Sequence, residues 1–229
     1  MTGRATRRQA LAAAIATIGA TLLPRSLRAK DVSVALIGNG VCTLTPETTA
    51  GPFYLDEDLV RQDIREDRAG VPLRLRLQVV DAACRPLPDA RVDVWHCDAG
   101  GVYSAFGMRE TGRDGMKDET FLRGTLFADS AGIVEFTTVY PGWYLGRTPH
   151  IHFKAFPDSR STLTGQIFLP DAVSDRIYGS APAYMREATR RATNANDRIA
   201  QRAGDAALAA LSEADGGYLA EMVIGVGDS

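Results

Sequence analysis

The chain has 229 residues, of which 45% are hydrophobic and 24% charged, and this split is typical of a soluble globular protein. It excludes a disordered, collagen-like or polytopic membrane chain, and the length favours one main domain. The net charge is −2, and without residues 1–29, which carry five arginines and no acid, it is −7. Because phosphate binding needs a basic surface, we expect neither nucleic acid nor anionic lipid as a partner.

Residues 1–29 have the pattern of an export signal. Arg7 and Arg8 precede an uncharged run, Ala10–Leu23, and these 14 residues are too few for a transmembrane helix, which needs about 20. Adjacent arginines before an alanine-rich run resemble a twin-arginine signal, which exports folded proteins, and an ordinary secretory signal is the alternative. With either signal we expect an exported protein, periplasmic or extracellular, without stable membrane insertion.

The cysteine count limits the covalent cross-links. An oxidising compartment allows at most one intramolecular disulfide among Cys42, Cys84 and Cys97. Because Cys84 and Cys97 flank a turn and a predicted strand, we expect these two to pair and Cys42 to be free.

Alternation of apolar and polar residues predicts short strands along much of the chain. Residues Leu73–Val79 alternate in this way, and so do residues Arg91–His96, as expected of strands with one buried face. The turn-forming residues 85–90 between them favour an antiparallel pair. Further strands are predicted at Phe121–Phe127, Ile133–Val139, His150–Phe156, Gln166–Leu169 and Tyr218–Val226.

This series of strands predicts an all-β fold. Short strands separated by residues rich in Gly and Pro favour an antiparallel β-sandwich with irregular loops and short peripheral helices. The helical candidates are Asp171–Tyr178 and Ala183–Ala203. We expect residues 30–67 to form an extended segment that packs on a core domain of residues 68–229.

Two of the three histidines, His150 and His152, lie one residue apart on a predicted strand. Side chains at i and i+2 of a strand point to the same face about 6.6 Å apart, so both imidazoles can bind one metal ion. The alternative is chance spacing of two ordinary polar residues. A zinc or copper site would need further ligands, which only His96 and Cys97 could add.

More specific motifs surround the histidine pair. The turn Pro141–Tyr144 precedes Arg147 and the run His150–His152, and a second tyrosine, Tyr103, follows the predicted strand that contains Val94 and Trp95. This arrangement resembles the intradiol ring-cleaving dioxygenases, whose signature is a Pro-Gly-x-Tyr turn, an arginine and His-x-His, with a second tyrosine after a Val-Trp strand.

Two other segments extend the resemblance. Residues Thr45–Tyr54 look like an N-terminal segment of that family, and Gln166–Phe168 resembles the strand that carries its active-site glutamine. The similarity runs from about Cys42 to Leu169, more than half of the chain. Gly165 stands where related chains often carry threonine, which leaves the packing of that strand open.

The resemblance implies one iron(III) per chain, bound by Tyr103, Tyr144, His150 and His152. Tyr103 and His152 would be equatorial, and Tyr144 and His150 axial. The ligand set is chemically consistent, because a phenol loses its proton beside a trivalent cation and hard phenolate oxygens suit iron(III) better than zinc. Tyr140 is the competing tyrosine, but the ligand follows Pro-Gly-x, and we expect Tyr140 to pack at a strand end.

The implied activity is oxidative cleavage of a catechol between its two hydroxylated carbons, with O2, to a cis,cis-muconate-type product. Tyr144 would accept a substrate proton, Arg147 would stabilise negative charge near the ring, and Gln166 would lie beside Arg147. The residues expected to bind the substrate are Gly51, Pro52, Tyr54 and Arg147, and Phe53 lies among them in the sequence.

Two other functions stay open at this point. One is an exported, transthyretin-like β-sandwich that binds a partner without catalysis, since a fold alone does not specify function. The other is a zinc or copper protein that uses His96 with the histidine pair. The chain resembles the exported, single-domain branch of the family, and a homo-oligomer is compatible with it. The identity of the catechol depends on loop residues between Ser104 and Glu119, which contain no motif.

Overall fold

The computed structural model describes residues 43–107, 116–158 and 162–227, which belong to one compact unit, Ser33–Ser229. The predicted signal peptide, Cys42 and residues 108–115 of the loop expected to select the substrate lie outside the described residues. Among the helices of the described ranges, none has the length and apolar composition that a membrane span requires.

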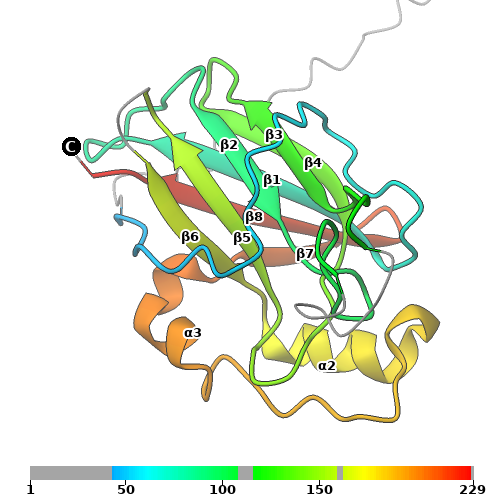
Figure 1. The fold of residues 1–229 in the computed structure, drawn as a ribbon. Helices are drawn as coiled ribbons and strands as arrows, with labels where there is room; N and C mark the ends of the chain where they lie inside the picture. The colour runs from blue at the N-terminus through cyan, green and yellow to red at the C-terminus, as the bar shows by residue number, and fades with distance from the viewer. Residues whose placement is uncertain (1–42, 108–115, 159–161, 228–229) are drawn as a thin grey trace, which may run out of the picture. The chain divides into compact units, whose positions relative to one another are not determined.

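Most of the regular structure lies in two four-stranded sheets (Figure 1), which confirms the predicted all-β class. The first sheet has the strand order β4-β1-β8-β7 and the second has the order β3-β2-β5-β6. In chain order the strands are β1 (Pro72–Val80), β2 (Arg91–Trp95), β3 (Arg123–Phe127), β4 (Ile133–Val139), β5 (His150–Phe156), β6 (Leu163–Phe168), β7 (Ala210–Ala214) and β8 (Gly217–Gly225).

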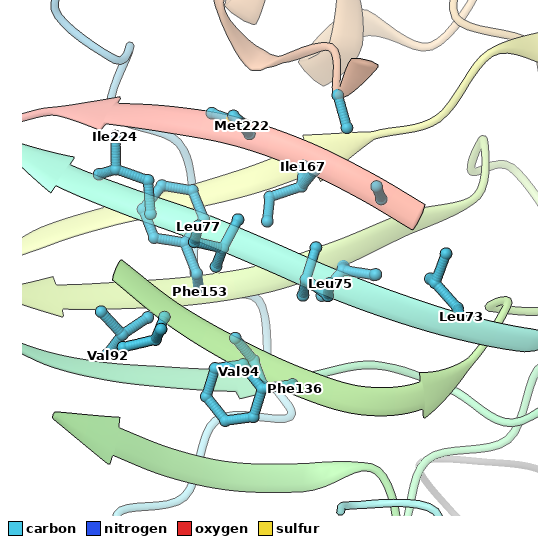
Figure 2. Close-up of a cluster of buried hydrophobic side chains, with 14 of the residues drawn as sticks. Leu73, Leu75, Leu77, Val92, Val94, Phe136, Phe153, Ile167, Met222 and Ile224 are labelled. Atoms are coloured by element: carbon cyan, nitrogen blue, oxygen red, sulfur yellow. The ribbon is translucent and has the colours of Figure 1, made fainter. Parts of the chain in front are cut away.

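One hydrophobic core is built from both sheets. Leu73, Leu75 and Leu77 of β1 are buried, and they share a cluster with Phe153 of β5 and Ile167 of β6 (Figure 2). Burial of one such side chain stabilises the fold by about 1.5–3 kcal/mol. Because side chains alternate along a strand, packing of Phe153 in this core directs its neighbours on β5 to the opposite face of the sheet.

The strand directions differ from the sequence expectation at one place. Strands β1 and β8 run parallel, with Leu73 opposite Tyr218, whereas the other strand pairs in the described residues are antiparallel. Alternation reports which face is buried but not the direction of the neighbouring strand. Strand β7 was not predicted, because it contains one large apolar residue, Leu211, and lies at a sheet edge.

Helix α2 (Asp171–Ser180) lies where the sequence predicted it, but the predicted helix Ala183–Ala203 is wrong. Only a 3-10 turn, η1 (Pro182–Tyr184), and a short helix, α3 (Arg198–Ala203), occur there, followed by η2 (Asp205–Ala207). The intervening residues bond to α2 instead of continuing a helix. The Asn194 backbone N–H donates to Asp171, and Arg190 forms ion pairs with Asp171 and Asp175.

The described part of the N-terminal segment, residues 43–67, contains no strand and hydrogen-bonds to both sheets. The N–H of Thr45 donates to the carbonyl of Gly225 in β8, and that of Thr48 donates to the carbonyl of Thr164 in β6, each at 2.9 Å. Further along, Ile64 is fully buried against the core. These bonds place Thr45 beside β8 and Thr48 beside β6, and Gly51 and Tyr54 then lie against His152 of β5 and Trp95 of β2.

The predicted disulfide between Cys84 and Cys97 is wrong. Cys97 is a free, buried thiol, whereas Cys84 is disulfide-bonded. The Cys97 side chain points inward, where it packs with Trp95 and Tyr103 and donates to the carbonyl of Gly142 at 3.4 Å. The predicted state of Cys42 lies outside the described residues.

Candidate metal centre and active site

Strand β5 brings the two histidines together. His150 and His152 are 2% and 1% exposed, and their Nε2 atoms are 3.1 Å apart. Trp95 of β2 lies opposite His152 and stacks on its ring, with centroids 4.9 Å apart and planes within 8°. This stacking fixes the plane of the His152 imidazole, so both rings face one point.

Burial keeps both histidines neutral, and a hydrogen bond fixes the tautomer of His150. The Nδ1 atom of His150 lies 2.7 Å from the carbonyl oxygen of Thr148. Because a carbonyl only accepts, Nδ1 carries the hydrogen and Nε2 presents a lone pair. Burial, reinforced by the charge of Arg147, lowers the pKa of His150 to about 3. Burial and the neighbouring His150 likewise lower the pKa of His152, and neutral imidazoles are the form that binds metals.

Two tyrosines complete the cluster. The Tyr144 hydroxyl lies 3.1 Å from His150 Nε2, and the Tyr103 ring lies 5.9 Å from the ring of Tyr144 and 6.1 Å from that of His152. Burial raises the pKa of Tyr144 to about 12 and that of Tyr103 well above its ordinary value. The Tyr103 hydroxyl oxygen is buried and has no hydrogen-bond partner within the described part of the chain.

Tyr140 is separate from this cluster. It is fully buried in the core, and its hydroxyl lies 2.7 Å from that of Ser174 on α2. Tyr140 therefore packs in the core, as the sequence indicated. Of Tyr140 and Tyr144, only Tyr144 contacts a histidine of the pair.

The donor set fits a hard, first-row metal ion. Two ligand nitrogens about 2.1 Å from one ion and at right angles lie about 3 Å apart, close to the separation between His150 and His152. A trivalent cation would also give the unpartnered oxygen of Tyr103 a partner. Its charge would counteract the rise in phenol pKa that burial causes at Tyr103 and Tyr144. Two phenol oxygens among four donors favour iron(III) over zinc.

The three-histidine zinc or copper site is not favoured. The Nδ1 atom of His96 lies 2.8 Å from the Cys97 carbonyl oxygen, and its Nε2 atom lies 2.7 Å from the Thr138 hydroxyl. Both ring nitrogens are therefore already bonded to protein groups. Across residues 43–107, 116–158 and 162–227, no three His, Cys, Asp or Glu side chains gather in a way that could hold a metal ion.

Arg147 and Gln166 lie beside the cluster. The Arg147 Nη2 donates to Gln166 Oε1 at 2.6 Å, and its Nη1 lies 3.5 Å from His150 Nε2. Gln166 is the cross-strand neighbour of His152, and its amide nitrogen donates to the carbonyl of Thr49 at 2.9 Å. The site thus combines four candidate metal ligands with one fixed cation.

Comparison with known proteins decides the family. Residues 46–201 match the family model described as Dioxygenase. The solved structure of an intradiol ring-cleavage dioxygenase from Tetranychus urticae is 33% identical in sequence, with a TM-score of 0.74 over 81% of this chain and 95% of that one. The chain belongs to the intradiol ring-cleavage dioxygenase family.

Curated members of this family match over a shorter part of their length. A catechol 1,2-dioxygenase from Pseudomonas sp. strain EST1001 is 32% identical over 148 residues, which are 55% of this chain and 47% of that protein. A hydroxyquinol 1,2-dioxygenase from Nocardioides simplex is 26% identical over 198 residues, 76% of this chain and 65% of that protein. The chain therefore spans about half to two thirds of the length of these dioxygenases.

Within this dioxygenase site, Asp197 is a residue that the sequence did not reveal. It is 4% exposed, and its Oδ2 accepts from Arg147 Nε at 2.7 Å and from the Thr148 N–H at 3.0 Å. Its Oδ1 caps α3 by accepting from the N–H groups of Ile199 and Ala200. Burial opposes ionisation, but these donors, Arg147 first, lower the pKa of Asp197. An Asp after Asn inside a supposed helix is a helix-start signal that could have located it.

The residues of the N-terminal segment that border the site differ in part from those expected to bind the substrate. Gly51 has φ +65°, and a side-chain carbon built there would lie 3.5 Å from the His152 ring, so Gly51 borders the site. Phe53 stacks on Tyr103 with ring centroids 4.2 Å apart. Tyr54 instead packs on Trp95 and donates to Asp93 at 3.0 Å. Pro52 is exposed between them.

Arg123 ties two parts of the site together and was also missed. It is buried on β3, where its Nη1 donates to the carbonyl of Phe53 at 2.7 Å and its Nη2 donates to that of Ser104 at 2.9 Å. Burial lowers the pKa of Arg123 to about 10. Its bonds hold the residues next to Tyr103 against the N-terminal segment.

Proposed function

We propose that the protein is a non-haem iron(III) dioxygenase that cleaves a catechol between its hydroxylated carbons, with O2, to a cis,cis-muconate-type product. The observation that carries this proposal is the close meeting of two buried, neutral histidines with two buried phenols beside Arg147. Two sheets that share one core support the β-sandwich scaffold that the family resemblance implies. The non-catalytic binding module is disfavoured, because a binding surface does not need this donor set.

Tyr103, Tyr144, His150 and His152 would hold one iron(III) per chain. When bound, the ion supplies a trivalent Lewis acid that favours deprotonation of the phenols and of the catechol and makes the ring reactive toward O2. The chain supplies the donors in the required protonation state, since the Thr148 carbonyl fixes the His150 tautomer.

Tyr144 acts as the proton acceptor for one catechol hydroxyl. Its ring is less enclosed than that of Tyr103, and of the four ligand candidates it alone lines the open pocket beside the site. Its high pKa, about 12 without a metal, makes its phenolate a strong base. The proton moves from the substrate oxygen to Tyr144 Oη.

Arg147 stabilises negative charge on the substrate oxygens. Asp197 and Gln166 hold two of its nitrogens, so the guanidinium needs little reorganisation when charge develops. Gly51 and Phe53 border the substrate from the N-terminal segment, and Tyr54 anchors that segment to Asp93 and Trp95.

The decisive experiment is oxygen uptake with a panel of catechols, together with product masses and metal analysis. We expect about one iron per chain, a visible tyrosinate-to-iron band, and incorporation of both oxygen atoms of O2. A colourless protein that binds stoichiometric zinc after growth with iron, or that consumes no oxygen with any catechol, contradicts the proposal.

The same proposal includes export. Arg7, Arg8 and the short apolar run that follows support a twin-arginine signal, the route for proteins that fold and bind their cofactor before crossing the membrane. A homo-oligomer is compatible with this role.

A further inference from the structure

An open pocket of about 910 Å³ lies directly beside the metal site. We call it the Tyr144 pocket. Its walls come from residues 100–102, 143–146 and several residues between 186 and 196. Tyr144 belongs to both the pocket and the site, and other lining residues directly adjoin site residues in sequence. These are Val102 before Tyr103, Gly146 before Arg147, and Asn196 before Asp197.

The volume exceeds what a single-ring catechol needs. A cavity of roughly 150 Å³ accommodates a benzene-sized molecule, and larger ligands with several rings occupy pockets of about 300–1,000 Å³. A catechol ring bound beside Tyr144 would leave most of the 910 Å³ to whatever substituent the ring carries.

The walls favour a flat, partly polar substituent. Trp143 and Leu145 supply apolar surface, and Leu145 is 89% exposed. The guanidinium of Arg186 lies 4.0 Å from the centre of the Trp143 ring, and its nitrogens donate to the carbonyls of Gly100 and Trp143 at 2.8 and 2.6 Å. These bonds join two walls and make a fixed platform. The exposed side chain of Arg191 adds a cation that can meet a hydroxyl or carboxylate group.

We infer that the Tyr144 pocket binds the ring substituent of an extended catechol, so that the preferred substrates carry a second aromatic ring with polar groups. The inference rests on the proposed function, since it places the catechol end of the substrate at the metal site. It narrows the substrate class from catechols in general to two-ring catechols.

Filling the pocket tests the inference. The substitution Ala192→Trp adds a large side chain at a lining position, and Ala183→Trp, on the exposed η1 turn outside the lining, is the matched control. For each iron-loaded protein, kcat/KM is measured with catechol and with 4-phenylcatechol. We expect wild type and Ala183→Trp to prefer 4-phenylcatechol, and Ala192→Trp to lose at least tenfold in the ratio of the two values. Equal losses for both substrates, or no preference in wild type, overturn the inference.

A binding measurement separates this inference from the proposed reaction. Calorimetric titration of metal-free protein with phenol and with 4-phenylphenol requires no turnover. Tighter binding of 4-phenylphenol, weakened at least tenfold by Ala192→Trp but not by Ala183→Trp, supports the pocket even where no catechol is oxidised. Equal affinity of wild type for the two phenols contradicts the pocket even where oxygen uptake establishes the dioxygenase. A protein that fails to fold is recognised by loss of the wild-type circular dichroism, and Ala188→Trp, at a neighbouring lining residue, then replaces Ala192→Trp.

Discussion

Tyr140 and Tyr144 adjoin the same Pro-Gly turn, yet their surroundings give them different roles. Tyr140 bonds to Ser174 within the core, whereas Tyr144 faces His150 and the open pocket. Sequence motifs were sufficient to nominate Tyr144, because the motif specifies the spacing from the turn. They did not nominate Arg123 or the partners of Asp197, because those contacts join residues far apart in the sequence; the local helix-start signal at Asp197 indicates a cap but not its bond to Arg147.

Substituting each tyrosine separates the two roles. Tyr144→Phe removes the proposed ligand oxygen and proton acceptor, so we expect turnover to fall by about 10²- to 10⁴-fold and the visible band to weaken. Tyr140→Phe removes one hydroxyl from a packing position, which should cost about 1 kcal/mol of stability and leave rate and colour nearly unchanged. The measurements are steady-state rates, visible spectra and unfolding curves. Loss of the band in Tyr140→Phe with retention in Tyr144→Phe would reverse the assignment.

Asp197→Asn tests whether the carboxylate positions Arg147. Asparagine keeps an oxygen that can cap α3, but it removes the buried ion pair with Arg147, so the free energy of unfolding should fall by about 1–3 kcal/mol. The second carboxylate oxygen, which accepts from Arg147 and Thr148, is lost, and we expect kcat to fall about tenfold or more with a smaller change in KM. Asp197→Ala, which also removes the cap, should lose about 1 kcal/mol of stability in addition. A normal kcat in a stable Asp197→Asn protein would show that Arg147 does not depend on this carboxylate.

The buried His96 predicts a pH dependence of stability. Burial lowers its pKa to about 4, below the value of about 6.5 in the unfolded chain. Between these values the unfolded chain binds a proton that the folded chain excludes, so the free energy of unfolding falls as the pH drops from about 6.5 to about 4, by on the order of 3 kcal/mol. In His96→Gln this contribution is absent. Urea unfolding at pH 7 and pH 4.5 should therefore show a smaller decline for the variant, and parallel declines would contradict the assignment.

At the scale of elements, alternation of apolar and polar residues predicted most strands correctly. The long helix predicted for residues 183–203 does not form. Alternation works because one face of each strand packs into the shared core, as in Leu73–Leu77. The segment after α2 has helix-forming residues, but the hydrogen bonds of Arg190 and Asn194 to α2 outweigh that weak local preference. Parallel pairing of β1 with β8 depends on the path of the chain between them, which alternation does not encode.

The packing of strand β6 against β5 explains the glycine at position 165. Gly165 lies opposite Phe153, and a side-chain carbon there would come within 2.2 Å of the Phe153 ring. Gly165→Thr should therefore destabilise the protein by about 1–3 kcal/mol through overpacking. Combined with Phe153→Leu, it should cost less than the sum of the two single changes, as measured by chemical unfolding. Gly179→Ala on α2, where no atom lies within 4 Å, is the control and should be neutral or slightly stabilising. Additive losses would show that the ring does not exclude a side chain.

For the whole molecule, composition and the number of predicted strands were enough to predict the fold class. They were not enough to predict which cysteines form a disulfide. Cys84 and Cys97 are 13 positions apart in the sequence, but their side chains belong to different surroundings, a turn and a buried cluster. Sequence spacing cannot show how far apart two residues lie in the folded chain.

The export proposal makes a prediction for the whole chain. Changing Arg7 and Arg8 to lysine should leave folded, iron-loaded protein in the cytoplasm, because a twin-arginine route requires the arginine pair. Fractionation of cells that express each form, with iron content measured in every fraction, tests it. Unchanged export of the variant would leave only a general secretory signal.

The hydrogen bond between Thr45 and Gly225 and the ion pair between Arg147 and Asp197 have a consequence for the timing of synthesis. A ribosome releases the chain from its N-terminus, so both histidines emerge well before the carboxylate that orients Arg147 and before the strand that anchors the N-terminal segment. The contacts that hold Arg147 and the N-terminal segment are therefore incomplete on a partly translated chain. They form only after nearly all of the described residues have been translated, in whichever compartment that folding takes place.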